Sequence, residues 1–315
     1  MFDVIGDIHG QGDALIALLN ELGYREEHGV YRHPDRKVIF VGDFVDRGPK
    51  IQLVLETVRA MCDAGSARAV MGNHEFNMIA YHTPDGRGGH LRPHTEKNRG
   101  QTRATLEQLS DAERKAWTDW FRTLPMWLEV DGLRVVHASW IEEQMDIIQE
   151  HRGQASVLSD EFLAEACQRG SDLYAAIEDV LKGTEATLPE GLSFLDKDGH
   201  RRTAARTRWY IDARRPGLTW QDYAFTFRDE ERSKLPAEEL PQDLREHAGY
   251  PEDAPPVIFG HYWVPPDERH MQPLAHNIAC VDFSAGKGKG GKLGAYRWDG
   301  ERELSADKFV AVSAG

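Results

Sequence analysis

The sequence has little cysteine and no long apolar run. Its 315 residues include three cysteines, Cys62, Cys167 and Cys280, which stand far apart and lack Cys-x-x-Cys spacing. Scattered cysteines in odd number predict free thiols in a reducing compartment and argue against a disulfide framework. No apolar stretch approaches the roughly 20 residues that span a membrane, and the amino terminus shows no basic, apolar leader. We therefore expect a cytoplasmic protein with no membrane association.

The sequence also lacks an excess of positive charge. Its formal net charge is −14 at pH 7, and because phosphate backbones attract positive surfaces, a stable nucleic-acid partner is not expected. The glycine–lysine run at 286–292 does not end in Gly-Lys-Ser/Thr, so it predicts a hairpin loop and not a phosphate-binding P-loop. A hydrophobic content of 40% is that of an ordinary globular protein with one large core. We expect one domain over residues 1–315.

What the sequence does contain is a short apolar segment, 38–41, that runs into a polar loop. Gly42 lets the backbone turn sharply, Asp43, Asp46 and Arg47 follow, and a helix is expected from about Pro49 to Ala64. Open α/β sheets bind their ligands at such strand-to-helix loops. Since Asp, Arg and Gly are also common turn residues, this loop alone is compatible with a functional and with a purely structural role.

The same pattern occurs three times in the first 75 residues. Apolar segments at 2–5, 38–41 and 67–71 each run into a glycine, after which polar side chains appear and a helix begins. This order predicts a parallel βαβαβ half-sheet whose polar loops all lie at its carboxyl edge.

Later segments predict further elements. Residues 127–130 and 133–136 flank Asp131-Gly132, a strong hairpin signal. Apolar runs indicate strands at 257–259, 278–283 and 293–298, and one helix is expected over 102–121. Ser159 and Ser171 are candidate helix N-caps.

Ligand-type side chains follow five of the expected strands. They are Asp7 with His9, Asp43, Asn73 with His74, His137, and His261. Carboxylate, imidazole and amide oxygen without thiolate suit Mn²⁺, Fe or Zn²⁺ and are too rich in nitrogen for a Mg²⁺ or Ca²⁺ site. A central Asp43 has two oxygens and can bridge two ions, which lie about 3.5–4 Å apart in sites that displace groups at phosphorus. We expect two divalent transition-metal ions, with manganese favoured over iron and zinc.

Three motifs carry a family resemblance. Residues 6–10, 42–48 and 72–75, followed by His137 and Gly260-His261, resemble the calcineurin-like metallophosphoesterases. Within that family they are most similar to the phosphoprotein phosphatase branch, which includes bacterial Ser/Thr phosphatases and diadenosine tetraphosphatases. The resemblance implies an α/β fold, a four-layer α/β/β/α sandwich with a dinuclear site between its sheets.

The resemblance also implies a role for each motif residue. One ion would be held by Asp7, His9 and Asp43, and the other by Asp43, Asn73, His137 and His261. A metal-bridging hydroxide would be the nucleophile, with Arg47 and Asn73 as ligands of the substrate phosphate. His74 would donate a proton to the leaving group and would be oriented by Asp46.

Departures from the family pattern argue against some members of the family. Gly260-His261 is followed by Tyr262 and Trp263 and not by a second histidine, which argues against cyclic-nucleotide and sugar-nucleotide enzymes. His137 is followed by Ala138-Ser139 and not by two glycines, which argues against a eukaryote-like protein phosphatase.

A segment between the last two histidines predicts a substrate contact. Residues 206–209 resemble a segment of symmetrical diadenosine tetraphosphatases, in which Arg206 or Arg208 would clamp a phosphate. The alternative is that these arginines only solvate the surface. The whole stretch 141–255 is expected to be an inserted helical cap.

The predicted function is hydrolysis of a phosphoric ester or anhydride, with a nucleoside polyphosphate of the diadenosine tetraphosphate type as the favoured substrate. A Ser/Thr protein phosphatase, acting on a phosphoprotein substrate, is the alternative within the enzyme class. A catalytically inactive phosphate-binding or regulatory protein on the same fold is the alternative from another class. Such proteins usually lack a metal ligand or the proton donor, and neither is missing here.

Overall fold

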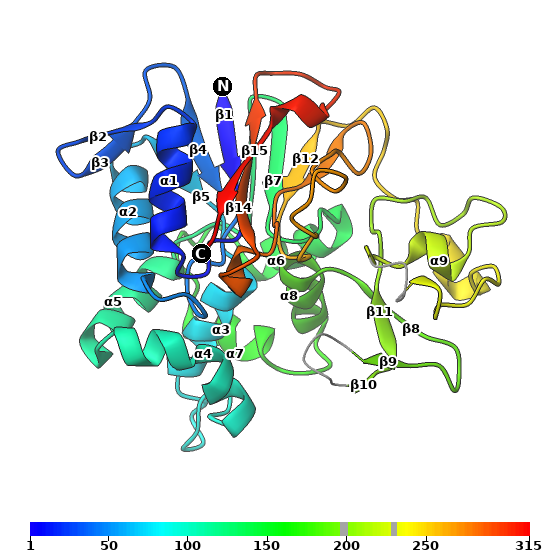
Figure 1. The fold of residues 1–315 in the computed structure, drawn as a ribbon. Helices are drawn as coiled ribbons and strands as arrows, with labels where there is room; N and C mark the ends of the chain where they lie inside the picture. The colour runs from blue at the N-terminus through cyan, green and yellow to red at the C-terminus, as the bar shows by residue number, and fades with distance from the viewer. Residues whose placement is uncertain (196–200, 228–231) are drawn as a thin grey trace.

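The computed structural model describes residues 1–195, 201–227 and 232–315, and it contains two main sheets (Figure 1). The first has the order β15-β14-β1-β4-β5, in which β1, β4 and β5 are parallel. Strand β14 pairs antiparallel with β1, and β15 pairs antiparallel with β14. Its strands are β1 (Phe2–Ile5), β4 (Lys37–Phe40), β5 (Ala67–Ala69), β14 (Lys292–Trp298) and β15 (Phe309–Ser313). The predicted parallel half-sheet is confirmed.

The second sheet has the order β13-β12-β7-β6. Strands β7, β12 and β13 are parallel, and β6 pairs with β7 as the predicted hairpin. Its strands are β6 (Trp127–Val130), β7 (Leu133–Val136), β12 (Val257–Phe259) and β13 (Ile278–Cys280). The mixed sheets with flanking helices confirm an α/β fold.

Buried side chains of both sheets meet in one apolar cluster. Val4 and Ile39 of the first sheet share it with Val135 and Ile258 of the second. The alternate strand residues, such as Ile5 and Phe40, belong instead to the larger cluster that the helices complete. This alternation follows from the period of two along a strand. The four-layer order of the predicted sandwich stays a prediction.

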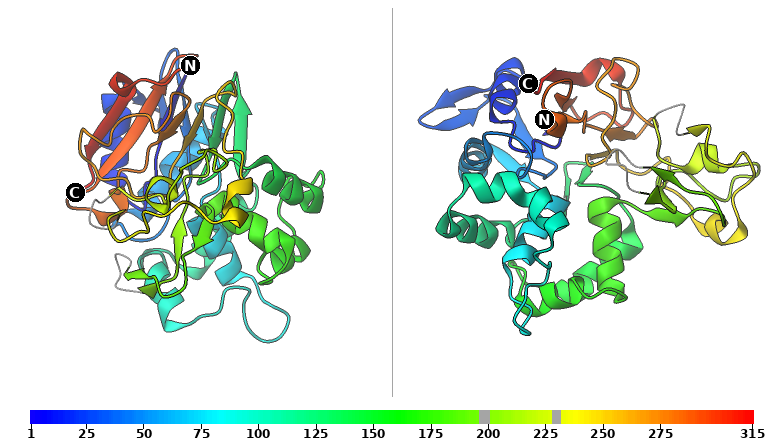
Figure 2. Two further views of the ribbon diagram at one scale, coloured as in Figure 1. Left: turned by 90° about the vertical axis from the view of Figure 1, so that its right-hand side faces the viewer. Right: turned by 60° about the horizontal axis from the view of Figure 1, so that its bottom comes forward.

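Helices cover the sheets and line the edge at which the parallel strands end (Figures 1 and 2). They are α1 (Gly12–Glu21), α2 (Ile51–Asp63), α3 (Asn73–His82), α4 (Glu96–Gln108), α5 (Asp111–Phe121), α6 (Glu142–Arg152), α7 (Asp160–Ala166), α8 (Asp172–Lys182) and α9 (Trp220–Tyr223). None of them, in the described part of the chain, has the length and apolar character to cross a bilayer.

One helix prediction was wrong. The single helix expected over 102–121 is two helices, because Ser110 caps α5 by accepting a hydrogen bond from the Glu113 backbone while the Glu113 carboxylate caps Ser110 in return. The helix expected from about Pro49 to Ala64 is confirmed as α2, Ile51–Asp63. The N-caps at Ser159 and Ser171 are confirmed by hydrogen bonds from Phe162 and Tyr174.

The segment 141–255 contributes to two different cores. Helices α6 and α8 bury residues such as Ile148 and Val180 in the large cluster. After α8, the chain forms two short ladders and α9, and Ala186, Ala205 and Trp220 pack in a small separate cluster. The short strands outside the main sheets are β2 (Arg25–Glu27), β3 (Val30–Arg32), β8 (Glu185–Thr187), β9 (Phe194–Leu195), β10 (Arg201–Arg202) and β11 (Ala204–Arg206). The extent of the predicted cap, 141–255, stays a prediction.

Candidate metal centre and substrate pocket

The carboxyl ends of the parallel strands bring the predicted ligand residues to one place. The loops after β1, β4, β7 and β12 and the start of α3 carry them. Five of the predicted site residues, His9, Asp43, Asp46, Arg47 and His261, have positive φ angles of 47°, 54°, 67°, 68° and 73°. Left-handed backbone is unfavourable for side chains of this size, and such strain concentrates at functional sites.

The glycines of the pattern are needed for close packing of these loops. A Cβ atom on Gly72 would lie 2.3 Å from Oδ1 of Asp43, and one on Gly260 would lie 2.1 Å from Oδ1 of Asp7. Only glycine lets the strand ends approach each other this closely.

Asp43 lies at the centre of the cluster. Its Oδ2 is 3.4 Å from Nε2 of His9, and its Oδ1 is 3.4 Å from Nε2 of His137. Oδ1 also accepts a hydrogen bond from the His74 backbone N–H at 3.0 Å. One carboxylate therefore faces two separate groups of ligand atoms: His9, Asp43 and His74 form one, and Asp43, His137 and His261 form the other.

His9 presents an unpaired ring nitrogen to this centre. Its Nδ1 lies 3.1 Å from the Val45 carbonyl, to which it can donate, whereas Nε2 is buried and has no hydrogen-bond partner. Burial lowers the pKa of His9 to about 3, against the opposing attraction of Asp43. The imidazole is thus neutral, with a lone pair on Nε2 aimed at the Asp43 carboxylate, as expected of a metal ligand.

The group formed by Asp43, His137 and His261 also brings hydrogen-bond acceptors close together. Nδ1 of His137 lies 2.7 Å from the Val41 carbonyl, and Nε2 of His137 lies 3.0 Å from Oδ1 of Asn73. Nδ1 of His261 lies 2.9 Å from that same amide oxygen. When His137 donates to Val41, its Nε2 lone pair faces oxygen atoms that also carry lone pairs. A cation between them would relieve this repulsion.

Three buried carboxylates surround the centre, and the sequence predicted only one of them as a ligand. Asp7 accepts hydrogen bonds at 3.1 Å from the His261 backbone, and its ligand atoms belong to neither group. Glu75 accepts from the backbone N–H groups of Asp43 and Phe44, so it shapes the bridging loop. Asp282 accepts from the Trp263 and Ser284 backbones.

The sequence could have indicated Asp282. The strand predicted over 278–283 ends at Cys280, and this places Asp282 at the same sheet edge as the other strand-end residues. Burial, with the neighbouring Asp282 and Asp43 carboxylates, raises the pKa of Asp7 well above its usual value. Such repulsion between carboxylates also points to missing positive charge.

His74 and Asp46 form a tight pair beside the centre. Nδ1 of His74 lies 2.6 Å from Oδ2 of Asp46, whose Oδ1 accepts from the hydroxyls of Thr102 and Thr105 in α4. Although burial favours the neutral imidazole, Asp43 and Asp46 raise the pKa of His74 above its usual value. The pair can therefore hold a proton and present it from Nε2.

A pocket of about 540 Å³ opens on this cluster. It brings together Asp43, Asp46, Arg47, Asn73, His74, Arg206 and His261 of the predicted site residues, whereas Asp7, His9 and His137 lie beneath it. Arg208 does not line this pocket but lines two other hollows. Trp263 covers Arg47, whose guanidinium carbon lies 4.6 Å from the centre of the indole ring.

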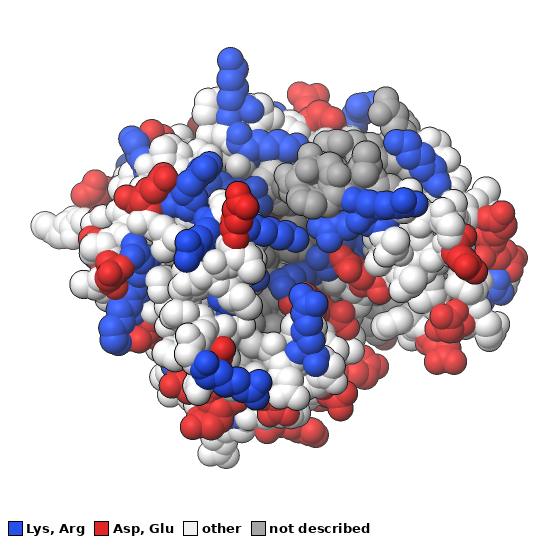
Figure 3. Space-filling model, turned by 90° about the horizontal axis from the view of Figure 1, so that it is seen from below, with Lys and Arg blue, Asp and Glu red and all other residues white. Residues whose placement is uncertain are grey.

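The pocket is rich in cations. In the view from below, Lys and Arg side chains gather around the hollow of this face (Figure 3). Among the described residues, the cations that line the pocket are Arg47, Arg92, Lys97, Arg169, Lys182, Arg202 and Arg206, against the acids Asp43, Asp46, Glu178, Asp179 and Glu185. Since two of these acids belong to the metal and proton-transfer cluster, the remainder of the wall is positive.

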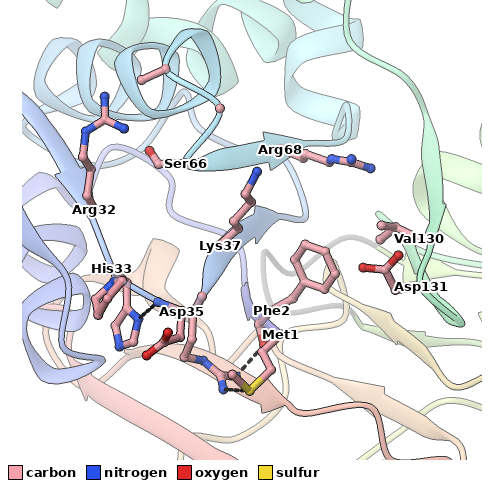
Figure 4. Close-up of a pocket in the computed structure, with 14 residues that line it drawn as sticks. Met1, Phe2, Arg32, His33, Asp35, Lys37, Ser66, Arg68, Val130 and Asp131 are labelled. Carbon is pink, nitrogen blue, oxygen red and sulfur yellow. Dashed lines mark hydrogen bonds between the residues drawn. The ribbon is translucent and has the colours of Figure 1, made fainter.

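A second hollow, of about 580 Å³, lies at the opposite edge of the first sheet. Figure 4 shows Lys37, the first residue of β4, in its wall together with Arg32 and Arg68. Asp35 and Asp131 are interspersed with these cations. Among the residues that the structure describes, the two metal-type groups both lie at the other edge, so this hollow contributes nothing to the candidate site.

Comparison with known proteins decides the family. Residues 1–183 match the calcineurin-like phosphoesterase family. The chain belongs to this family. The family implies a dinuclear metal site, and the His/Asp cluster of this chain offers residues for it.

Curated relatives match only parts of this metallophosphoesterase. The asymmetrical bis(5′-nucleosyl)-tetraphosphatase PrpE of Bacillus subtilis is 36% identical over 127 residues, covering 39% of this chain and 48% of that protein. The symmetrical bis(5′-nucleosyl)-tetraphosphatase of Vibrio cholerae is 32% identical over 145 residues, covering 46% of each chain. The chain thus spans about half the length of these relatives, and a third in the case of PrpE from Halalkalibacterium halodurans. A crystal structure of a diadenosine tetraphosphatase homologue aligns over 99% of this chain with 16% identity and a TM-score of 0.44.

The donor set of this metallophosphoesterase fits two divalent ions. The lone pair on Nε2 of His9, the acceptors that face each other at Asn73, and the two oxygens of Asp43 could all serve as ligand atoms of a cation. Imidazole with carboxylate suits manganese, iron or zinc.

Metal removal is expected to cost stability as well as activity. Without cations, the Asp7, Asp43 and Asp282 carboxylates and Glu75 repel one another in a buried region. We expect about two bound ions per chain, and chelation should abolish turnover and lower Tm by at least about 5 °C. Elemental analysis and thermal unfolding with and without chelator measure this. Active protein without metal, with a Tm that is indifferent to chelators, would contradict it.

Proposed function

We propose that this protein hydrolyses phosphoric anhydrides of a nucleoside polyphosphate, such as a dinucleoside tetraphosphate, at the cluster described above. One observation carries the proposal: the metal-type cluster opens into a large pocket whose outer wall is positive. A simple monoester offers one phosphate and needs one clamp, whereas a polyphosphate chain uses several cations at once. The names of the curated relatives support the same substrate class.

Each site residue has a role in this proposal. Asp7, His9 and Asp43 would hold one ion, and Asp43, Asn73, His137 and His261 the other. When bound, the ions would supply Lewis acidity that activates a water molecule and neutralises phosphate charge. The Arg47 guanidinium and the Asn73 amide would bind phosphate oxygens, and Trp263 would keep Arg47 in place through its ring face.

His74 would act on the leaving group. Its Nδ1 is held by Asp46, so Nε2 carries the proton that the departing oxygen needs. Asp46 in turn is fixed by Thr102 and Thr105, which keep its carboxylate from rotating away. In this arrangement the bond between phosphorus and the leaving oxygen breaks as that oxygen receives the proton.

The finer features of the fold belong to the same proposal. A four-layer sandwich would place the cluster between the two sheets, and the cap at 141–255 would form one wall of the pocket. In support, Arg169, Tyr174, Lys182 and Arg206 all come from that segment and line the pocket. Localisation in the cytoplasm and the absence of a nucleic-acid partner stay predictions.

Arg206 and Arg208 provide a matched pair for testing the substrate. Arg206 lines the pocket and contacts the Gly183 carbonyl and Glu185, whereas Arg208 lines other hollows. We expect Arg206→Met to lower kcat/KM for a dinucleoside tetraphosphate about ten- to a hundredfold, and for p-nitrophenyl phosphate much less. Arg208→Met should change neither by more than about twofold.

The outcomes separate the alternatives. Equal losses on both substrates would make Arg206 a general phosphate clamp. Turnover of phosphopeptides but not of dinucleoside polyphosphates by the unaltered protein would support the Ser/Thr phosphatase alternative and refute the proposed substrate. A panel of dinucleoside polyphosphates, mononucleotides and phosphopeptides therefore accompanies the two variants.

A further inference from the structure

One arginine of the pocket, Arg92, is held in place by two neutral amides. Arg92 lies between α3 and α4, where its Nη1 donates to Oδ1 of Asn77 at 2.9 Å and its Nη2 donates to Oε1 of Gln101 at 2.7 Å. Its backbone N–H donates to the Ala80 carbonyl at 2.9 Å. Both helices and the backbone therefore fix the guanidinium.

Among the described residues, no ion pair neutralises the charge of Arg92. Asn77 and Gln101 are neutral, and among residues 1–195, 201–227 and 232–315 no carboxylate forms an ion pair with this guanidinium. Burial lowers the pKa of Arg92, against longer-range attraction from groups that include Asp46 and Glu178. A half-buried cation whose two hydrogen-bond partners are neutral amides is stabilised when an anion joins it.

Arg92 also has a defined position relative to the reaction centre. Asn77, which holds it, follows His74 by three residues on α3, so the two side chains lie on one face, one helical turn apart. Gln101, its other partner, precedes Thr102 on α4, and Thr102 binds Asp46. The same two helices thus hold the His74–Asp46 pair and Arg92 at a fixed separation.

Position and chemistry together identify the group that Arg92 meets. His74 faces the leaving oxygen, so a group beyond His74 along α3 belongs to the leaving group and not to the phosphate under attack. Lys97, from the first turn of α4, and Arg169, before α8, line the same pocket. A leaving group that meets these cations would itself be an anion.

We propose that Arg92, together with Lys97 and Arg169, forms a subsite for a phosphate of the leaving group. This inference rests on the proposed function, because it assigns His74 to the leaving-group side. It makes the protein selective for phosphoric anhydrides, whose leaving group is a phosphate, over phosphoric esters, whose leaving group is an alcohol.

Competition experiments test the subsite without requiring the natural substrate. With p-nitrophenyl phosphate as reporter, the Ki values of orthophosphate, pyrophosphate and tripolyphosphate are measured at a fixed concentration of free metal ion, because polyphosphates chelate metals. In Arg92→Met, the Ki of tripolyphosphate should rise about tenfold or more relative to that of orthophosphate. Arg92→Lys keeps the charge but loses the planar guanidinium that Asn77 and Gln101 hold. Its ratio of Ki values should therefore lie between those of the unaltered protein and Arg92→Met.

Arg99 supplies the control. It is exposed on α4 and does not line the pocket, so Arg99→Met removes the same charge from the same helix and should leave both Ki values within about twofold. Metal content and Tm of each variant show that the fold is retained. An unchanged ratio of Ki values in both Arg92 variants, or equal rises for orthophosphate and tripolyphosphate, would overturn the subsite.

Failure of the subsite and failure of the proposed function give different results. If the unaltered protein does not hydrolyse a dinucleoside tetraphosphate but binds tripolyphosphate through Arg92, the subsite stands and the proposed substrate falls. If it hydrolyses the tetraphosphate and Arg92→Met lowers kcat/KM for this anhydride no more than for p-nitrophenyl phosphate, the substrate stands and the subsite falls.

Discussion

Asp43→Asn is expected to abolish metal binding and to cost more activity than any other single ligand change. Asp43 is the one residue common to both groups of ligand atoms, with Oδ2 facing His9 and Oδ1 facing His137, each at 3.4 Å. Replacement by asparagine removes a charge from both groups and turns one oxygen into an N–H donor. Loss of a residue that only hydrogen-bonds to a metal ligand lowers metal affinity or activity about 10- to 100-fold. Since Asp43 would itself be a ligand, we expect kcat/KM to fall more than about a hundredfold.

The substitution is well suited to the site because its effect on the backbone is small. Asp43 has a φ of 54°, and asparagine is among the residues that tolerate this conformation. The amide oxygen of the substituted side chain can still accept from the His74 N–H, as the Asp43 carboxylate does. The folded protein should therefore persist while its metal is lost.

Measurement of bound metal, kcat/KM and Tm checks this prediction. Chelation should no longer lower the Tm of the variant, because the ions are already absent. Asp13→Asn, which removes an exposed carboxylate from α1, provides the control and should leave all three quantities unchanged. Two bound ions and near-normal turnover in Asp43→Asn would show that Asp43 does not bridge the centre.

The sequence predicted the parallel half-sheet and the strand-end residues because both depend on local patterns. Short apolar runs determined β1, β4 and β5, and parallel strands bring whatever follows them to one edge. His9 and Asp43 could therefore be placed together without any knowledge of distances, whereas His137 follows β7 of the second sheet and was joined to them through the family resemblance.

What the sequence could not predict depends on contacts between distant segments. The break between α4 and α5 is an exception, because the capping box of Ser110 and Glu113 is a local signal that was overlooked within a run that otherwise favours helix. Arg206 and Arg208 are separated by one residue, yet Arg206, the last residue of β11, lines the pocket, whereas Arg208, beyond the strand, lines other hollows. Arg92 was one of several scattered cations in the sequence, and its importance emerges only from the two amides that hold it.

The last prediction concerns the proton donor. His74→Asn should leave metal content intact, because the role assigned to His74 is proton transfer. General acids contribute about 10²–10⁴-fold, so turnover of an alkyl phosphate, whose alkoxide leaves poorly, should fall by that factor. An activated aryl phosphate needs little protonation and should lose less than about tenfold.

Turnover of the alkyl and the aryl phosphate, measured together with metal content, shows whether His74 is a proton donor or a metal ligand. Its Nε2 lies 3.9 Å from Oδ2 of Asp43, so it also belongs to one of the metal-type groups. If His74 were a ligand, metal content would fall and both substrates would slow alike. His151→Asn, at an exposed position on α6, controls for the substitution itself. A selective loss on the alkyl phosphate, with the ions still bound, is the result that assigns the proton to His74, since only a leaving group that needs protonation can distinguish an acid from a ligand.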